Sequence, residues 1–255
     1  MEPLMLNCGI EMPRIGFGTW KMADGEEAYA AVTKALQAGY RLIDTAKYYG
    51  NEVSVGKAVR ESGIPRSDIF VTTKLWPTDF LHPRKAFEKS LRLLDIGTID
   101  LYLVHWPVPG MPKSIWKALE PLCEEKLVRS IGVSNYDVET LRHTLSYAKV
   151  IPAVNQIKFN PLHFNSDVLE FCKQNDIVVE AYSPLDRGSL SDETITQVAK
   201  KHGKTNAQVM LRWCVQHGTV PLPKSVHPER MRENLAVFDW QLDEEDMESL
   251  NSLTT

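Results

Sequence analysis

Residues 42–49 read L-I-D-T-A-K-Y-Y, so a short apolar run ends in Asp44 and two tyrosines, Tyr48 and Tyr49, follow within five residues. A carboxyl group at the end of a buried strand is costly unless a nearby group compensates it. Two other strand-like runs also end in ionisable groups: I-F-V-T-T precedes Lys74, and D-L-Y-L-V ends at His105. The fold must therefore explain how these strand ends meet.

Strand and helix patterns alternate along the chain. Near-continuous apolar runs are typical of parallel strands buried on both faces, and they predict strands at 15–18, 41–44, 69–75, 100–105, 128–134, 153–157, 177–183 and 220–223. Apolar residues at helical spacing predict helices at 26–38, 51–61, 83–94, 114–125, 137–148, 166–175, 206–217 and 228–238. Asp137 and Ser166 are the predicted N-caps of two of them. Eight strand–helix repeats predict an α/β protein with the (β/α)8 TIM-barrel fold.

Three further segments accompany the repeats. A small hairpin is expected at 4–13 with its turn at 7–9, an extra helix at 192–202, and a terminal helix at 243–253. No linker, low-complexity tract or change of composition divides the chain. We therefore expect one domain over residues 1–255.

Composition and charge exclude several functional classes. The 255 residues are 43% hydrophobic and 24% charged, which is ordinary for a globular protein. The net charge of −4, without a long block of like charge, argues against a general nucleic-acid or membrane-surface binder. No apolar run approaches the roughly 18 residues of a membrane span, and the N-terminus does not resemble a signal peptide. The four scattered cysteines lack metal-ligand spacing, so we expect free thiols, no metal site and a cytoplasmic protein.

A barrel would bring the ionisable strand ends together, because the active sites of such barrels lie at the C-terminal ends of the strands. Each residue alone has an ordinary structural interpretation: Asp44 as a turn cap, Lys74 as a strand end facing water, and His105 as a core residue. These interpretations weaken when all three occupy corresponding strand ends. The pattern therefore indicates a shared site.

The residue types in this site suit proton donation to a carbonyl oxygen. Tyrosine is a weak acid with a reference pKa of about 10, and a buried ammonium beside it lowers that pKa by stabilising the phenolate. Lys74 would supply the ammonium, Asp44 would hold it, and His105 would donate a hydrogen bond to the carbonyl oxygen. The spacing leaves open whether Tyr48 or Tyr49 is the donor, and a hydride source is still required.

A phosphate-binding segment follows the last predicted strand. It reads P-K-S-V-H-P-E-R-M-R-E-N at 223–234, where Pro228 suits the first turn of a helix. Arg230 near that turn opposes the helix dipole, and a bound anion would reverse this penalty. Lys224, Ser225 and Arg230 would cradle a phosphate monoester, although a solvated basic helix start is the alternative. Glycine patterns at 16–18 and 50–57 lack the spacing of nucleotide-binding loops.

The ordered motifs resemble those of the aldo-keto reductase family from end to end. They are G-F-G-T-W (16–20), G-Y-R-L-I-D-T-A-x-x-Y-G-N-E (39–52), T-T-K-L-W (72–76), D-L-Y-L-V-H-W-P (100–107), I-G-V-S-N-Y (131–136), P-A-V-N-Q (152–156), A-Y-S-P-L (181–185) and P-K-S-x-x-x-x-R-x-x-E-N (223–234). The resemblance implies a barrel whose bottom is closed by the N-terminal hairpin.

The resemblance also implies residue roles and NADPH as the cofactor. It implies a catalytic tetrad in which Tyr49 is the proton donor, formed by Asp44, Tyr49, Lys74 and His105. The amide of the nicotinamide would be held by Ser134, Asn135 and Gln156. The nicotinamide ring would stack on Tyr182. Ser183 and Leu185 would contact the pyrophosphate. The 2′-phosphate would be held by Lys224, Ser225 and Arg230, and the adenosine end would be contacted by Glu233 and Asn234.

Four aromatic residues at strand ends or in the loops after them would line an apolar substrate pocket: Trp20, Tyr48, Trp76 and Trp106. Larger relatives fold a C-terminal tail over this pocket, whereas this sequence stops at Thr255 and its loops at 107–113 and 186–191 are short. An open mouth and a broad substrate range are therefore expected. Lys47 would attract acidic substrates or be solvent-exposed without a role, and Lys158 has no assigned role.

The expected function is NADPH-dependent reduction of aldehydes or ketones by a monomer, with small aldehydes, methylglyoxal and keto sugar acids as substrates. One alternative is a cofactor-binding homologue without catalysis. Another is a Schiff-base aldolase that uses Lys74, since barrels employ strand lysines in this way. A nucleophilic lysine must be neutral, so a partner such as Asp44 that keeps it charged argues against this alternative.

Overall fold

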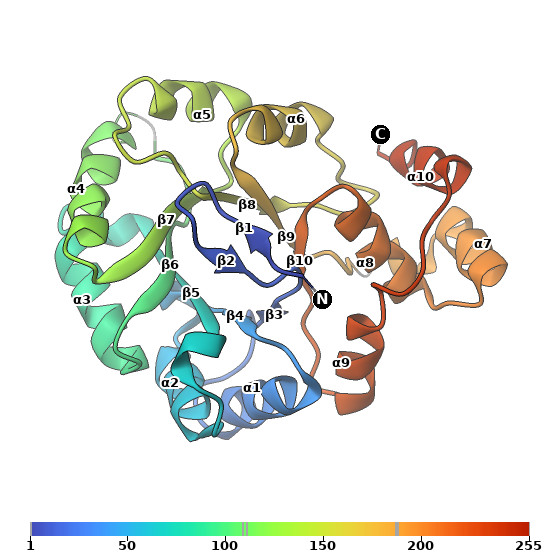
Figure 1. The fold of residues 1–255 in the computed structure, drawn as a ribbon, viewed down its shortest axis with the longest axis horizontal. Helices are drawn as coiled ribbons and strands as arrows, with labels where there is room; N and C mark the ends of the chain where they lie inside the picture. The colour runs from blue at the N-terminus through green and yellow to red at the C-terminus, as the bar shows by residue number, and fades with distance from the viewer. Residues whose placement is uncertain (1, 109, 111, 187–188, 255) are drawn as a thin grey trace.

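Eight parallel strands form a nearly closed barrel in the computed structural model, which describes residues 2–108, 110, 112–186 and 189–254 (Figure 1). Neighbouring strands follow sequence order: β3 (Phe17–Gly18), β4 (Leu42–Asp44), β5 (Phe70–Leu75), β6 (Ile99–Val104), β7 (Val128–Ser134), β8 (Val154–Lys158), β9 (Val178–Tyr182) and β10 (Val220–Leu222). The N–H groups of Gly16 and Gly18 donate to the carbonyls of Pro221 and Pro223 at 2.9 and 3.0 Å. These bonds join the first strand to the last, so the predicted TIM barrel is confirmed.

Helices surround the barrel and follow the predicted strand–helix alternation. Those of the repeats are α1 (Glu26–Ala38), α2 (Glu52–Glu61), α3 (Pro83–Leu94), α4 (Pro112–Glu124), α5 (Val138–Leu145), α6 (Ser166–Gln174), α8 (Asn206–Gln216) and α9 (Pro228–Leu235). The two predicted extra helices, α7 (Glu193–His202) and α10 (Glu244–Asn251), pack against each other outside this ring (Figure 1). Among the described residues, none of the helices has the length and apolarity needed to cross a bilayer.

The sequence predicts side-chain caps for two of the helices, α5 and α6. Asp137 caps α5 as predicted, because its carboxylate accepts a hydrogen bond from the Thr140 N–H at 2.8 Å. The prediction of Ser166 as a cap was wrong. Asn165 caps α6 instead, accepting from the Val168 N–H at 3.0 Å, and Ser166 is the first helical residue. The amide oxygen of Asn165 satisfies the same free N–H groups that a serine would have satisfied.

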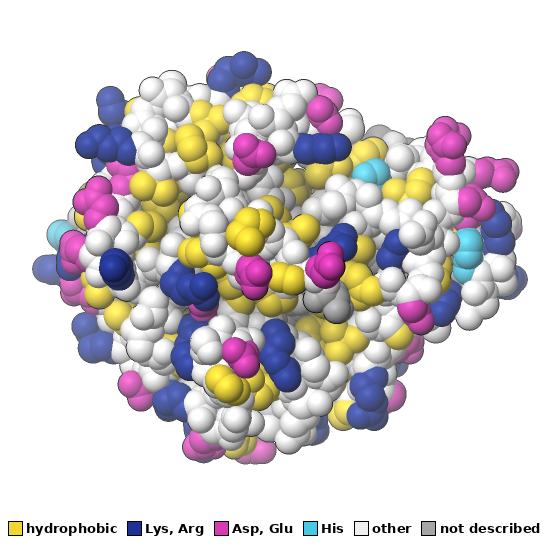
Figure 2. All heavy atoms as spheres, in the orientation of Figure 1, with side chains coloured by type: hydrophobic (Ala, Val, Ile, Leu, Met, Phe, Trp, Pro, Cys, Tyr) yellow, Lys and Arg dark blue, Asp and Glu magenta, His cyan; other side chains and the backbone are white. Residues whose placement is uncertain are grey.

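The N-terminal hairpin closes one end of the barrel. Its strands β1 (Leu4–Met5) and β2 (Glu11–Met12) pair antiparallel and lie across the barrel centre in Figure 1. Leu6 and Met12 are buried against an apolar layer inside the barrel, formed by Leu42, Phe70, Leu101, Leu103, Val154, Val220 and Leu222. On the face shown in Figure 2, which carries this hairpin, acidic and basic side chains are interspersed.

The barrel interior changes from apolar to polar along the strands. Successive side chains of a strand point to opposite faces, so every second residue points inward. Two residues beyond the apolar layer, β4 and β8 place Asp44 and Gln156, and β9 places Glu180 two residues after Val178. Lys74 lies four residues after Phe70 on β5, an even spacing that keeps it on the same inward face. This second layer, at the C-terminal ends of the strands, is the floor of the candidate site.

Helix α2 starts three residues after Tyr49 and packs very closely on α3. A Cβ atom at Gly56 would lie 1.9 Å from the carbonyl oxygen of Leu94, so Gly56→Ala forces the two helices apart. We expect it to lower the free energy of unfolding by about 2–3 kcal/mol in urea titrations. The same change in an exposed helix would stabilise by about 1 kcal/mol.

The control for this prediction is Val53→Ala on the exposed face of α2, where Val53 is 48% exposed. It should change the free energy of unfolding by less than about 0.5 kcal/mol. An equal or higher urea midpoint for Gly56→Ala would contradict the close contact between α2 and α3.

Candidate active site

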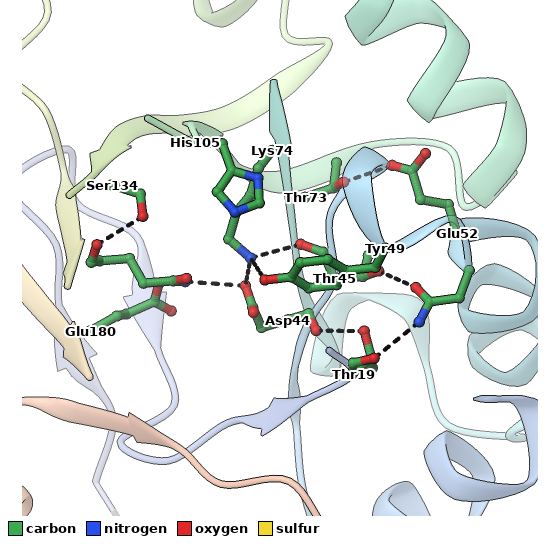
Figure 3. Close-up of polar contacts among 12 residues, drawn as sticks. Thr19, Asp44, Thr45, Tyr49, Glu52, Thr73, Lys74, His105, Ser134 and Glu180 are labelled. Carbon is green, nitrogen blue, oxygen red and sulfur yellow. Dashed lines mark hydrogen bonds and ion pairs between the residues drawn. The ribbon is translucent and has the colours of Figure 1, made fainter. Parts of the chain in front are cut away.

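The ends of β4 and β5 bring a carboxylate and an ammonium together beside a tyrosine (Figure 3). Lys74 is fully buried, and its Nζ lies 2.5 Å from Asp44 Oδ2 and 2.9 Å from the carbonyl oxygen of Thr45. It also donates to the hydroxyl oxygen of Tyr49 at 3.3 Å. Tyr49 comes from a short 3₁₀ helix, η1 (Lys47–Tyr49), that directly follows β4. Because Lys74 donates to the phenol oxygen, the phenol hydrogen is left for another acceptor.

The electrostatics of this chain of contacts keep Lys74 charged and Tyr49 protonated. Burial lowers the pKa of Lys74, but Asp44 and Tyr49 raise it more, so it lies above its ordinary value. Burial raises the pKa of Tyr49 to about 12, although Lys74 acts to lower it. The prediction that the pKa of the tyrosine falls below its reference value was therefore wrong. The effect of Lys74 is present, and desolvation outweighs it.

His105, which follows β6, completes the group. Its imidazole faces the Tyr49 ring edge-on with the ring centroids 5.8 Å apart. Burial, helped by the nearby Lys74 charge, lowers the pKa of His105 to about 3. The ring is therefore neutral at physiological pH and carries one N–H. Its Nδ1 is buried and has no hydrogen-bond partner among the described residues.

Sequence reasoning missed one ionisable group of this layer, Glu180 on β9. It is fully buried, and Gln156 Nε2 donates to its Oε2 at 2.8 Å and to Asp44 Oδ2 at 3.1 Å. Burial and the neighbouring Asp44 carboxylate raise the pKa of Glu180 to about 8. A signal was present, because Glu180 is an acid within the apolar run I-V-V-E-A-Y-S at 177–183. The cost of a buried carboxyl group, which singled out Asp44, applies equally there.

The four residues expected to hold the nicotinamide lie beside the tetrad at the ends of β7, β8 and β9. Asn135 Nδ2 donates to the carbonyl of His105 at 3.1 Å, and the hydroxyl of Tyr182 donates to Asn135 Oδ1 at 2.9 Å. Ser134 Oγ donates to the carbonyl of Gln156 at 2.8 Å. Hydrogen bonds thus link this group to the tetrad through the His105 backbone and the Gln156 side chain.

The loop after β9 contains the two residues expected at the pyrophosphate. Ser183 is exposed, adopts a left-handed φ of 49°, and accepts a hydrogen bond at its carbonyl from Asn160 Nδ2 at 3.0 Å. Leu185 is half-buried against the outer core. Residues 187 and 188 of this loop, and 109 and 111 of the loop after β6, lie outside the described residues. The expectation of a mouth opened by short loops therefore falls partly outside them.

The segment expected at the 2′-phosphate presents two cations at the start of α9. Lys224 and Arg230 are exposed and form no ion pair with any described residue. Ser225 is buried, and its Oγ accepts from the His227 N–H at 3.1 Å. At the other end of the helix, Glu233 accepts a hydrogen bond from the Thr205 hydroxyl at 2.5 Å, and Asn234 is buried.

Three of the four predicted pocket aromatics form one stack at the mouth. The Tyr48 ring stacks on Trp76 at 3.8 Å between centroids and on Trp20 at 5.4 Å, and Trp76 meets His105 edge-on at 5.0 Å. Trp106 is 43% exposed and makes no ring contact with them among the described residues.

Lys47, whose role the sequence leaves open, and Lys158, which has no assigned role, both have partners. Lys47 pairs with Asp79 of a short 3₁₀ helix, η3 (Pro77–Asp79), which offsets its charge beside the mouth. Lys158 at the end of β8 contacts His163 Nε2 and Asp186 Oδ2, each at 2.9 Å.

The structure gathers three potential metal-ligating side chains away from the mouth: His202, Asp243 and Asp246. Lys201 Nζ already lies 2.6 Å from Asp243 and 2.9 Å from Asp246. The carboxylates therefore have a cationic partner within the chain, and the cluster serves to hold α7 against α10.

Comparisons with known proteins identify the family of this chain. The model of the aldo/keto reductase family matches residues 14–255. The chain is 45% identical to the 9,11-endoperoxide prostaglandin H2 reductase of Trypanosoma cruzi, over 97% of this chain and 90% of that protein. It is 44% identical to the glyoxal reductase of Bacillus subtilis, over 99% of this chain and 92% of that protein. MGS-M4, an aldo-keto reductase from a Medee basin deep-sea metagenome library, has a crystal structure that superposes with a TM-score of 0.95 at 46% identity, covering 99% of this chain and 95% of that one.

The family match over nearly the whole chain, the full-length relatives and the barrel agree with one another. The chain belongs to the aldo/keto reductase family and is an oxidoreductase that acts on carbonyl groups.

Proposed function

We propose that this protein reduces aldehydes and ketones to alcohols with NADPH, and that Tyr49 is the general acid. The observation that carries this proposal is the chain from Asp44 through Lys74 to the phenol oxygen of Tyr49, with distances of 2.5 and 3.3 Å. This arrangement leaves a phenol hydrogen free and places a positive charge beside the oxygen that must give it up. Such a site is built to protonate an oxygen as negative charge develops on it.

In the proposed reaction the carbonyl oxygen of the substrate accepts hydrogen bonds from the Tyr49 hydroxyl and the neutral His105 ring. When bound, NADPH supplies the hydride that adds to the carbonyl carbon. The Tyr49 proton passes to the carbonyl oxygen, and the ammonium of Lys74 stabilises the phenolate that remains. Asp44 keeps Lys74 charged throughout.

The residues beside the tetrad have the chemistry that NADPH requires. The amides of Asn135 and Gln156 suit the carboxamide, and the half-buried ring of Tyr182 suits stacking on the nicotinamide. Ser183 and Leu185 would contact the pyrophosphate. Ser134 would also contact the carboxamide. The 2′-phosphate would be held by Lys224, Ser225 and Arg230, and the adenosine end by Glu233 and Asn234.

The two exposed cations of this segment should select NADPH over NADH. Hydrogen bonds to charged groups contribute about 1.5–3 kcal/mol each, so replacing both Lys224 and Arg230 by alanine should weaken NADPH binding by about 100-fold or more. NADH, which lacks the 2′-phosphate, should bind the variant and the wild type equally. The dissociation constants should be measured by quenching of tryptophan fluorescence at two salt concentrations. The loss of NADPH affinity should be smaller at the higher salt concentration.

The matched control is Arg232→Ala, which removes another exposed cation from the same helix. It should change NADPH affinity by less than about threefold. A parallel loss of NADH affinity in the double variant would show that these cations do not contact the 2′-phosphate.

Small aldehydes, methylglyoxal and keto sugar acids are the proposed substrates, and a relative named glyoxal reductase supports the first of these classes. The test is NADPH oxidation followed at its nicotinamide absorbance, with methylglyoxal, a substituted benzaldehyde and a keto sugar acid, and with NADH in parallel. We expect turnover with NADPH and little with NADH. NADPH binding without turnover of any carbonyl would instead favour a cofactor-binding protein that is not a catalyst.

We further propose that the chain works as one domain and as a monomer in the cytoplasm, without a nucleic-acid or membrane partner. The four free cysteines support a reducing compartment. Light scattering on the purified protein tests the oligomeric state, and a dimer mass would contradict it.

A further inference from the structure

Two buried carboxyl groups, those of Asp44 and Glu180 (Figure 3), share one amide inside the barrel. The Nε2 atom of Gln156 lies 3.1 Å from Asp44 Oδ2 and 2.8 Å from Glu180 Oε2, so both of its hydrogens are used. The other oxygen of Glu180, Oε1, is buried and has no hydrogen-bond partner among the described residues. A buried carboxyl group left partly unpartnered is costly and calls for an explanation beyond packing.

We propose that Glu180 is a positioning residue of this site: it fixes the amide of Gln156 and, through that amide, holds the Asp44 carboxylate against Lys74. The inference rests on the proposed function, because the groups that Glu180 positions are those of the proposed reduction. With both hydrogens of Nε2 committed to carboxyl oxygens, the Gln156 amide has only its Oε1 atom left for a ligand. This oxygen accepts no hydrogen bond from the described residues and is therefore available to a carboxamide N–H.

Glu180 also adds a charge that opposes the reaction once it ionises. Burial is the main cause that raises the pKa of Glu180, and the Asp44 carboxylate on β4 raises it further. The hydrogen bond from Gln156 and the Lys74 charge on β5 lower it, so the pKa reaches about 8. Below that pH the carboxyl group is neutral. Above it, a second carboxylate behind Asp44 opposes the negative charge that develops on the carbonyl and phenol oxygens, so turnover should fall as the pH rises through about 8.

The test is the pH dependence of kcat between about pH 6 and 10 for the wild type and two variants. Glu180→Gln keeps the shape of the side chain without the charge. Its kcat should stay within about threefold of the wild type at pH 7 and lose the fall near pH 8. Glu180→Leu removes the acceptor, and its kcat should fall about tenfold or more while the KM of the carbonyl changes less than threefold.

Two further variants separate positioning from packing. Glu52→Gln is the matched control: Glu52 is also buried with a raised pKa, but its carboxyl group accepts from Thr73, which points to the outer side of β5. It should keep the wild-type pH profile. In a Gln156→Leu background, Glu180→Leu should have little additional effect, because the amide through which Glu180 acts is gone.

The outcomes distinguish this inference from the proposed function. If the wild type does not turn over any carbonyl with NADPH, the proposed function fails. If the wild type is active and Glu180→Leu keeps the wild-type kcat, the positioning role of Glu180 is overturned while the proposed function stands. If the alkaline fall survives in Glu180→Gln, the assignment of that fall to the Glu180 carboxyl group is overturned. The NADPH dissociation constant and the melting temperature of each variant identify any that misfold, and Glu180→Met, which also lacks the acceptor, replaces Glu180→Leu if that variant does not fold.

Discussion

Tyr49→Phe should lower kcat for every carbonyl substrate by about 10²–10⁴-fold, which is the usual contribution of a positioned general acid. The substitution removes only the hydroxyl group. The ring contacts with Trp20 at 4.8 Å and with His105 at 5.8 Å remain possible, so the pocket should keep its shape. NADPH affinity should therefore change less than threefold, and the effect should appear in kcat rather than in binding.

Tyr48→Phe is a stringent control for this prediction, because it removes a hydroxyl from the adjacent residue. The Tyr48 hydroxyl forms no hydrogen bond with the described residues, and the ring is 51% exposed. Its kcat should stay within about threefold of the wild type. Tyr49→Phe with near wild-type kcat would remove Tyr49 from the role of acid, and a large loss in Tyr48→Phe alone would transfer that role.

The two titrations near this site should separate in a pH profile. Tyr49 stays protonated through the neutral range, because burial raises its pKa to about 12. An alkaline fall near pH 8 therefore points to Glu180, whose pKa is raised to about 8.

The barrel could be predicted from sequence because an apolar strand run followed by a helical pattern occurs eight times along the chain. The meeting of Asp44, Lys74 and His105 could be predicted because the C-terminal ends of all strands lie at the same end of such a barrel. Helix caps were harder to predict. Asn165 and Ser166 are both good N-cap residues, and only the backbone geometry shows which of them caps α6.

The pKa of Tyr49 could not be predicted, because it depends on the balance between the field of Lys74 and the extent of burial. Sequence indicated the partner and gave no measure of the burial. The pairings of Gln156 with Glu180 and of Lys47 with Asp79 join residues from different strands or loops. Such contacts depend on side-chain directions that a linear pattern does not carry.

Lys74→Met should both slow the reaction and destabilise the fold. Without the ammonium, burial and Asp44 both raise the pKa of Tyr49, so the phenol becomes a weaker acid and kcat should fall by about 10²–10³-fold. The Asp44 carboxylate would also lose its cationic partner in a fully buried position. Removing one member of a buried ion pair typically costs about 3–5 kcal/mol, which urea titration would measure.

The double variant Asp44→Asn with Lys74→Met separates the two roles. It removes the uncompensated charge, so at least about half of the lost stability should return, whereas kcat should stay as low as in Lys74→Met. Lys47→Met is the matched control: Lys47 is half-exposed and pairs with Asp79, so neutral carbonyls should be reduced at nearly the wild-type rate. If kcat returned with stability in the double variant, Lys74 would act only through the fold. Borohydride trapping of a carbonyl on wild-type Lys74 would instead revive the Schiff-base alternative, which the raised pKa of this charged lysine opposes.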